Sequence, residues 1–348
     1  MAYTTINKSG EHFNTKLYTG DGNQQNVTGV GFQPDWTWVK QRGAATDHSM
    51  QDAVRGVGKQ LQSNDTSAET SNNNSLVGFV SDGFTVGFGT GDADAKVNAS
   101  GGTYASWNWK ANGAGSANTD GSISSTVSAN TTSGFSTVSY TGTGSLATVG
   151  HGLGVAPAMI IIKNRSTTNG WEVYHQGIGN TKYLALHISN AAIASTSRWD
   201  NISPTSTLFT VNTENGVNKS SSNHIAYCFA EKKGYSKFGK YEGNNSVDGP
   251  FIYTGFKTAF VMFKRYDSTS NWTMLDTKRS PYNLMINELY ANHPNAEGQA
   301  GRNIDCLSNG IKIRSSSDEI NATSGKYIYM AFAEAPLVGT NNVPATAR

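Results

Sequence analysis

The chain has little charge, few cysteines and no long apolar run. Only 15% of its 348 residues are charged and the formal net charge is +2, so no broad basic field is present to attract nucleic acid. The two cysteines, Cys228 and Cys306, stand in no metal-ligand or redox spacing, which argues against a disulfide scaffold. No apolar stretch approaches the ~20 residues of a membrane-spanning helix. We therefore expect neither nucleic-acid binding nor membrane insertion, and the polar opening MAYTTINKSGEHF indicates no signal peptide.

Aromatic and small polar residues are abundant in the chain. Aromatic residues make up 10% of the chain, too many for a disordered protein. Glycine, serine, threonine and asparagine are abundant. This composition is typical of many short strands joined by polar turns.

One pattern recurs three times along the chain. Its anchor is an apolar, strand-like phrase that ends in lysine: WTWVK, MIIIK and FVMFK. A Tyr-x-Gly precedes each lysine, and an asparagine and a closing aromatic residue follow it, at nearly constant spacing. The members are Tyr18, Tyr140 and Tyr241; Lys40, Lys163 and Lys264; Asn98, Asn218 and Asn321; and Trp109, Phe229 and Phe332. Self-similarity at a domain-sized period predicts three copies of one unit.

The repeats set the expected domain bounds. The first unit covers residues 1–113, and a Gly/Ser/Thr/Asn-rich segment, 114–134, follows as a flexible linker. The second unit covers 135–234. The third covers 235–348 and ends in a mobile C-terminal tail, GTNNVPATAR.

Strand and turn signals dominate each unit. Asp-Gly or Asn-Gly lies between strand-like runs at 81–88, 213–218 and 307–313, which predicts three hairpins. Residues 280–290 predict one short helix, with Ser280 as its cap and Pro281 in its first turn. Many short strands without alternating helices favour an all-β protein. We expect three tandem antiparallel jelly-roll-like β-sandwich domains.

The anchor lysines have an architectural interpretation. Lys40, Lys163 and Lys264 each follow a strand that is apolar on both faces. A lysine at the solvent end of such a strand can bury its stem and keep its charge in water. The alternative is a ligand site shared by the three repeats.

The first unit resembles a domain of tailed-bacteriophage virion proteins. The resemblance covers about residues 1–113 and rests on YTGDGNQQNVTGVGFQPDWTWVKQR, DAVRG, LQSN, SDGFTVGF and VNASGGTYASWNWKANG. The second and third units lack DAVRG and keep only the framework positions. That domain looks like a relative of concanavalin A-like and SPRY-type sandwiches.

The resemblance implies a tail-fibre or other structural protein of a virion, assembled in the host cytoplasm. It brings no catalytic residues, metal or cofactor with it. The implied partners are other virion proteins, of the tail or the capsid, and a host surface glycan. Because fibres often trimerise, the expected homo-oligomer is a trimer.

Five residues are candidates for ligand binding. Asp52, His175 and Asp276 occupy one repeat position, and Trp171 and Trp272 stand four residues before the last two. An aromatic face beside a polar group can bind a sugar ring. The alternative, which we favour, is a structural contact that recurs because the fold recurs.

Other chemical signals are weak. The paired-carboxylate string of sandwich glycan hydrolases, Glu-x-Asp-x-x-Glu, does not occur, and Glu231 and Glu334 stand singly at strand ends. Asp92 and Asp94 lie in a glycine-flanked loop without a full calcium-ligand set. Neither Gly-x-Ser-x-Gly nor a phosphate-binding glycine loop is present. We therefore expect a non-enzymatic protein.

Four functions remain open at this stage. The first is a tail fibre or adhesin that recognises the host, and the second is a capsid decoration or head-fibre protein. The third is a depolymerase that degrades glycans, which would need two carboxylates brought together by the fold. The fourth is a cellular carbohydrate-binding module. Family resemblance alone favours the first.

Overall fold

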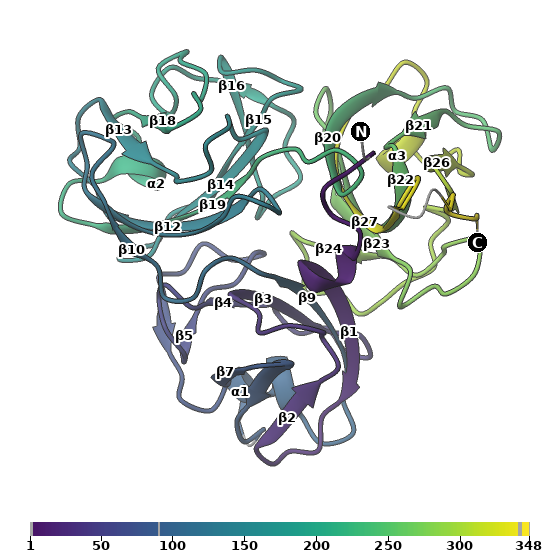
Figure 1. Ribbon diagram of the computed structural model, residues 1–348, viewed down its shortest axis with the longest axis horizontal. Coiled ribbons are helices and arrows are strands. Elements are labelled where there is room, and N and C mark those ends of the chain that lie inside the picture. The colour runs from purple at the N-terminus through teal and green to yellow at the C-terminus, as the bar shows by residue number, and fades with distance from the viewer. Residues whose placement is uncertain (1–2, 90, 340–342, 348) are drawn as a thin grey trace.

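The computed structural model describes residues 3–89, 91–339 and 343–347, and strands dominate it (Figure 1). The ladders between its strands are antiparallel, which confirms the expected all-β architecture of β-sandwich type. The helical elements described are η1 (Ser9–Glu11), α1 (Asp92–Asn98), α2 (Asn215–Asn218) and α3 (Asp318–Asn321). Within the described ranges, no helix has the length and apolarity needed to span a membrane.

A large sheet and a small sheet belong to each repeat. In repeat 1 the large sheet is β1 (Phe13–Thr19), β9 (Thr103–Trp109), β3 (Trp36–Gln41) and β4 (Ser49–Asp52), in spatial order. The small sheet is β2 (Gln25–Thr28), β8 (Gly83–Val86) and β7 (Leu76–Val80), and a separate pair is β5 (Lys59–Gln60) and β6 (Thr70–Ser71).

Repeat 2 has the widest sheet. Its order is β10 (Ser116–Asn118), β11 (Ser125–Asn130), β12 (Phe135–Thr141), β19 (Asn223–Phe229), β14 (Met159–Asn164), β15 (Trp171–His175), β16 (Lys182–Ala185) and β17 (Ile193–Ala194). The small sheet is β13 (Ala147–Gly150) and β18 (Leu208–Val211).

Repeat 3 follows the same plan. Its large sheet is β20 (Ser236–Glu242), β27 (Lys326–Pro336), β22 (Phe256–Arg265), β23 (Trp272–Asp276) and β24 (Leu289–Tyr290). Its small sheet is β21 (Phe251–Tyr253), β26 (Gly310–Ile313) and β25 (Ile304–Leu307). In all three repeats the closing strand therefore lies between the first strand and the anchor strand.

The two faces of each large sheet pack against different neighbours. One face packs on its own small sheet and forms three separate clusters, one in each repeat. The other face carries the large side chains and joins a single core shared by all three repeats. Figure 1 shows the three lobes around this common centre. Small residues on one face and aromatic residues on the other allow this double packing.

Aromatic contacts in the shared core link every pair of repeats. Trp36 of repeat 1 stacks on Tyr227 of repeat 2 with ring centroids 4.2 Å apart. Phe13 of repeat 1 stacks on Phe332 of repeat 3 at 4.9 Å. Phe229 of repeat 2 contacts Phe238 of repeat 3 at 5.9 Å. Burial of such large apolar side chains is the main stabilising contribution available to the assembly.

The recurring Tyr-x-Gly closes the same loop in each repeat. The tyrosine hydroxyls donate to the carbonyl before each recurring asparagine: Tyr18 to Val97, Tyr140 to Val217 and Tyr241 to Ile320. A Cβ on the glycine would lie 2.4 Å from a backbone carbonyl oxygen in all three copies: Gly20, Gly142 and Gly243. The asparagine amide donates to the carbonyl five residues after the tyrosine, at Asn23, Ser145 and Ser246. The repeated residues are therefore a backbone brace.

Several local predictions differ from the structure. The predicted linker, 114–134, instead contributes β10 and β11 to the sheet of repeat 2. On β11, Thr126 and Ser128 alternate with Val127 and Ala129, which pack in the hydrophobic cluster of repeat 2. The hairpins at 81–88 and 307–313 are present. The one at 213–218 is instead the short helix α2.

The C-terminal half contains two further differences. Residues 280–288 are not helical, since the segment bridges to β25 through Met285 and Ile304. The predicted mobile tail includes residues 340–342 and 348, which lie outside the described residues. Within the described part of the tail, the Ala345 amide donates to the Leu337 carbonyl.

Candidate functional site

The five predicted ligand-binding residues lie where the repeats meet. Each is at most 1% exposed: Asp52, Trp171, His175, Trp272 and Asp276. A sugar that stacks on an aromatic ring needs an exposed ring face. The prediction that these five residues bind a ligand is therefore wrong. Their positions agree with the alternative, a structural contact that recurs because the fold recurs.

The first contact joins each repeat to the one before it in a cycle. Trp171 of repeat 2 donates its indole Nε1–H to the Gln62 carbonyl of repeat 1 over 2.7 Å. Trp272 of repeat 3 donates to the Ala185 carbonyl of repeat 2 over 3.0 Å. His48 occupies this position in repeat 1, and its Nε2 lies 2.9 Å from the Tyr290 carbonyl of repeat 3.

In the second contact, the residue at the Asp52 position of each repeat meets the repeat that follows it in the cycle. The Tyr227 hydroxyl of repeat 2 donates to Asp52 of repeat 1 over 2.8 Å. The Trp107 indole of repeat 1 donates to Asp276 of repeat 3 over 3.1 Å. At the remaining boundary, His175 Nε2 lies 3.2 Å from the Tyr329 carbonyl of repeat 3. The ring is thus closed by equivalent contacts at all three boundaries.

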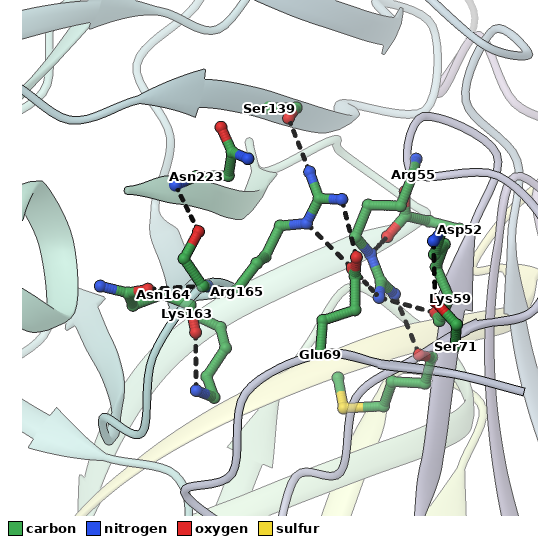
Figure 2. Close-up of polar contacts among 12 residues, drawn as sticks. Asp52, Arg55, Lys59, Glu69, Ser71, Ser139, Lys163, Asn164, Arg165 and Asn223 are labelled. Atoms are coloured by element: carbon green, nitrogen blue, oxygen red, sulfur yellow. Dashed lines mark hydrogen bonds and ion pairs between the residues drawn. The ribbon is translucent and has the colours of Figure 1, made fainter. Parts of the chain in front are cut away.

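An ion network surrounds Asp52 at the boundary of repeats 1 and 2, which we call joint 1–2. Arg55 is fully buried and pairs with Asp52, and it also reaches Glu69 at 3.1 Å. Glu69 then accepts two hydrogen bonds, each 2.9 Å long, from Arg165 of repeat 2. Figure 2 shows Glu69 between the two arginines. Burial opposes ionisation of Glu69, but the two guanidinium groups outweigh it and lower its pKa.

The same network recurs at joint 3–1, between repeats 3 and 1. Arg279 is fully buried, pairs with Asp276 and lies 3.2 Å from Glu297. Glu297 accepts hydrogen bonds of 2.9 and 2.7 Å from Arg42 of repeat 1. The hydrogen bond to Glu297 raises the pKa of Arg42. Two of the three joints are therefore ionic and bidentate, which fixes the orientation of the sheets they connect.

Joint 2–3, between repeats 2 and 3, has the same backbone hydrogen bond as the other two joints, but uncharged side chains surround it. The Ala192 amide donates to the Tyr266 carbonyl, as Glu69 does to Arg165 and Glu297 to Arg42. His175 and Ile178 replace the Asp and Arg of the other two joints. Ile178, Ala192 and Tyr266 all pack against the shared core. Burial lowers the pKa of His175 to about 4, so its ring is neutral at pH 7.

The anchor lysines do not reach solvent, so the expectation that their charges lie in water at the strand ends is wrong. Lys40, Lys163 and Lys264 are fully buried. Their amines donate to backbone carbonyls, including Thr66 of the preceding repeat for Lys163 and Ser189 of the preceding repeat for Lys264. Burial lowers the pKa of Lys40 and of Lys163 to about 8, and that of Lys264 to about 7.

The other candidate residues for chemistry lie apart from one another in the described ranges. No group of three histidine, cysteine or acidic side chains is placed to hold a metal ion there. Glu231 pairs with Lys237 at 2.6 Å, and Glu334 pairs with Lys257 at 3.2 Å. Asp92 and Asp94 fall in helix α1 and not in a loop. Both cysteines are free and buried.

The family assignment follows from a match that spans all three repeats. Residues 8–336 match the family described as a domain of unknown function, DUF7483. The chain belongs to this family. A search of curated proteins found no match to the chain.

Sequence reasoning missed the ionic joints. The signal was present, because QDAVRG and LDTKRS both contain Asp-x-x-Arg, at Asp52 with Arg55 and at Asp276 with Arg279. An Asp and an Arg three residues apart at a strand end can pair locally. Glu69 and Glu297 complete each network from distant loops, and no local pattern marks them.

Proposed function

We propose that this protein is a non-enzymatic structural component of a bacteriophage virion, exposed on the particle as part of a tail fibre that recognises the host. The observation that carries the proposal is that the residues shared by the three repeats are buried in the brace, the core and the joints. Their recurrence therefore reflects architecture and not repeated chemistry. The resemblance of residues 1–113 to phage virion domains supplies the biological context.

The remaining parts of the proposal follow from the same context. Its partners are other proteins of the tail or capsid and a host surface glycan, and it is assembled in the host cytoplasm. A homotrimer of the chain belongs to the proposal as well, and size-exclusion chromatography with light scattering measures it directly. No nucleic acid, membrane insertion or cofactor is part of the proposal.

A capsid decoration or head-fibre protein is the second candidate. The observation that favours it is the arrangement of the three lobes around one centre, in which no lobe extends away as a shaft (Figure 1). A depolymerase is less well supported, because Glu231 and Glu334 are each held by a lysine. Glycoside hydrolysis needs two carboxyl groups on either side of one bond.

Immunogold labelling of purified phage particles tests the proposal. Antibodies against the chain are applied to intact virions, with the free protein as positive control. Gold on the tail supports host recognition, and gold spread over the head supports the decoration protein. Unlabelled particles that also lack the chain in a denaturing immunoblot would show that the virion assignment is wrong.

A further inference from the structure

Exposed aromatic side chains concentrate on the third repeat. In the described part of the chain, the large exposed aromatic residues are Phe88 at 48%, Phe251 at 46%, Tyr253 at 53% and Tyr282 at 79%. Phe251 and Tyr253 belong to β21, the edge strand of the small sheet. Ile252 between them is buried, so both rings lie on the outer face of the sheet.

The fold does not require aromatic residues at these two positions. The central residue of the corresponding strand is buried and paired in each repeat: Val27 with Phe84, Val149 with Phe209 and Ile252 with Ile311. The flanking positions hold Asn26 and Thr28 in repeat 1, and Thr148 and Gly150 in repeat 2. Exposed aromatic residues that packing does not explain indicate a binding surface.

A cleft adjoins this face. It has a volume of about 270 Å³ and is lined by Tyr3 and Tyr253 with Glu231, Lys233 and Lys237, among others. We call it the Tyr3–Tyr253 cleft. Tyr3 of the N-terminal segment forms one wall of it, and that segment lies beside repeat 3 in Figure 1.

Two hydrogen bonds fix that wall. The Tyr3 hydroxyl donates to the Gly255 carbonyl over 2.7 Å, and the Thr4 hydroxyl donates to the Lys233 carbonyl over 2.7 Å. The cleft is therefore formed before any ligand arrives, which lowers the entropic cost of binding.

The charges around the cleft are largely compensated. Lys237 pairs with Glu231 at 2.6 Å, and the Lys233 amine lies over the Tyr3 ring, 4.6 Å from its centroid. On the adjoining sheet face Lys312 pairs with Asp248 at 2.8 Å, and Arg314 pairs with Asp305 at 2.6 Å. A surface with paired charges suits a neutral ligand better than a polyanion. The pairs still offer donors and acceptors to hydroxyl groups.

We propose that the Tyr3–Tyr253 cleft, extended by Phe251, binds a neutral oligosaccharide. The rings of Phe251 and Tyr253 contact the apolar C–H faces of the sugar rings, and Glu231 and Lys237 hydrogen-bond the hydroxyl groups. The inference rests on the proposed role in host recognition and gives that role a site. Glu231 is the carboxylate among the residues that line the cleft, so the arrangement binds sugar and does not hydrolyse it.

The experiment uses the full chain on a microarray of neutral and anionic oligosaccharides. The neutral oligosaccharide that binds best is then titrated by calorimetry. Phe251→Asn and Tyr253→Thr introduce the residues that repeat 1 carries at these positions, so both variants are expected to fold. Each is expected to bind at least about tenfold more weakly, as for the loss of a central contact residue. Phe88→Ser removes an exposed ring in repeat 1 and is the matched control, with unchanged affinity expected.

The outcomes separate this inference from the proposed function. No binding, binding to anionic sugars alone, or unchanged affinity in Tyr253→Thr would overturn the cleft. Gold on the tail in any of those cases leaves host recognition standing without this site. Tyr253-dependent sugar binding by a chain that is not in the virion would support the cleft and refute the phage assignment.

Discussion

Glu69 of repeat 1 and Arg165 of repeat 2 form a bidentate ion pair, with both hydrogen bonds 2.9 Å long. Glu297 and Arg42 form the equivalent pair between repeats 3 and 1. Ala192 and Tyr266 meet at the third joint. The three repeats are thus held as a closed ring, with charge at two joints and apolar contact at the third.

Glu69→Gln is expected to destabilise the protein. The substitution removes the charge that Arg165 and the fully buried Arg55 share. Leaving a buried donor with a poorer partner costs about 1–3 kcal/mol. Chemical denaturation monitored by tryptophan fluorescence measures the change in the free energy of unfolding.

Two further variants interpret that result. Glu297→Gln is expected to cost a similar amount, since it disrupts the equivalent network. Glu11→Gln breaks the exposed pair with Lys8 and is expected to change the stability by less than about 1 kcal/mol. Equal effects in Glu69→Gln and Glu11→Gln would contradict a structural role of the joints.

Lys163→Met is expected to lower the thermal midpoint and leave sugar binding unchanged. The variant keeps the apolar stem but leaves the carbonyls of Asn164 and Thr66 without this donor. Lys182→Met, at an exposed position, is the control. A specific loss of sugar binding in folded Lys163→Met would show that the buried amine belongs to a ligand site.

Gly142→Ala is expected to destabilise the fold by about 1–3 kcal/mol, as for an overpacked core position. The new Cβ would lie 2.4 Å from the Lys219 carbonyl oxygen, so the backbone must shift. At Gly10 a Cβ would meet nothing within 4 Å, which makes Gly10→Ala the matched control. Equal thermal midpoints for the two variants would refute the backbone brace.

Stability is expected to fall as the pH drops from about 6.5 towards 4. Burial, with a contribution from Lys40, lowers the pKa of His48 to about 3, and burial lowers that of His175 to about 4, from the usual 6.5. In this window the unfolded chain binds more protons than the folded chain, so protons favour unfolding. Thermal midpoints across this range test the direction. His175→Asn should make the thermal midpoint less dependent on pH in this range. An unchanged pH dependence would show that protonation of His175 does not contribute to it.

The sequence revealed the parts of the fold that depend on local order. Tyr-x-Gly and the recurring asparagine belong to one backbone brace, and their spacing from the anchor lysine predicts three repeats. The aromatic face of the closing strand lies in the core. That this core is shared by three repeats could not be predicted, because Trp36 and Tyr227 meet only through tertiary packing.

The predictions that failed depended on distant partners. Trp171 and Asp276 have residue types suited to a sugar site, but both face another repeat. The charge of Lys163 was expected to lie in solvent, but its amine donates a hydrogen bond to a backbone carbonyl of the preceding repeat. The cleft could not be predicted because Tyr3 and Tyr253 lie far apart in the sequence and are not part of the repeated pattern.

Calorimetric unfolding of the intact chain tests the closed ring most directly. A shared core and contacts at all three boundaries predict one transition, with calorimetric and van't Hoff enthalpies equal. Glu69→Gln should shift that whole transition to lower temperature. Separate transitions for the repeats, or a shift of only part of the heat absorption in Glu69→Gln, would show that the repeats unfold independently and would contradict the account.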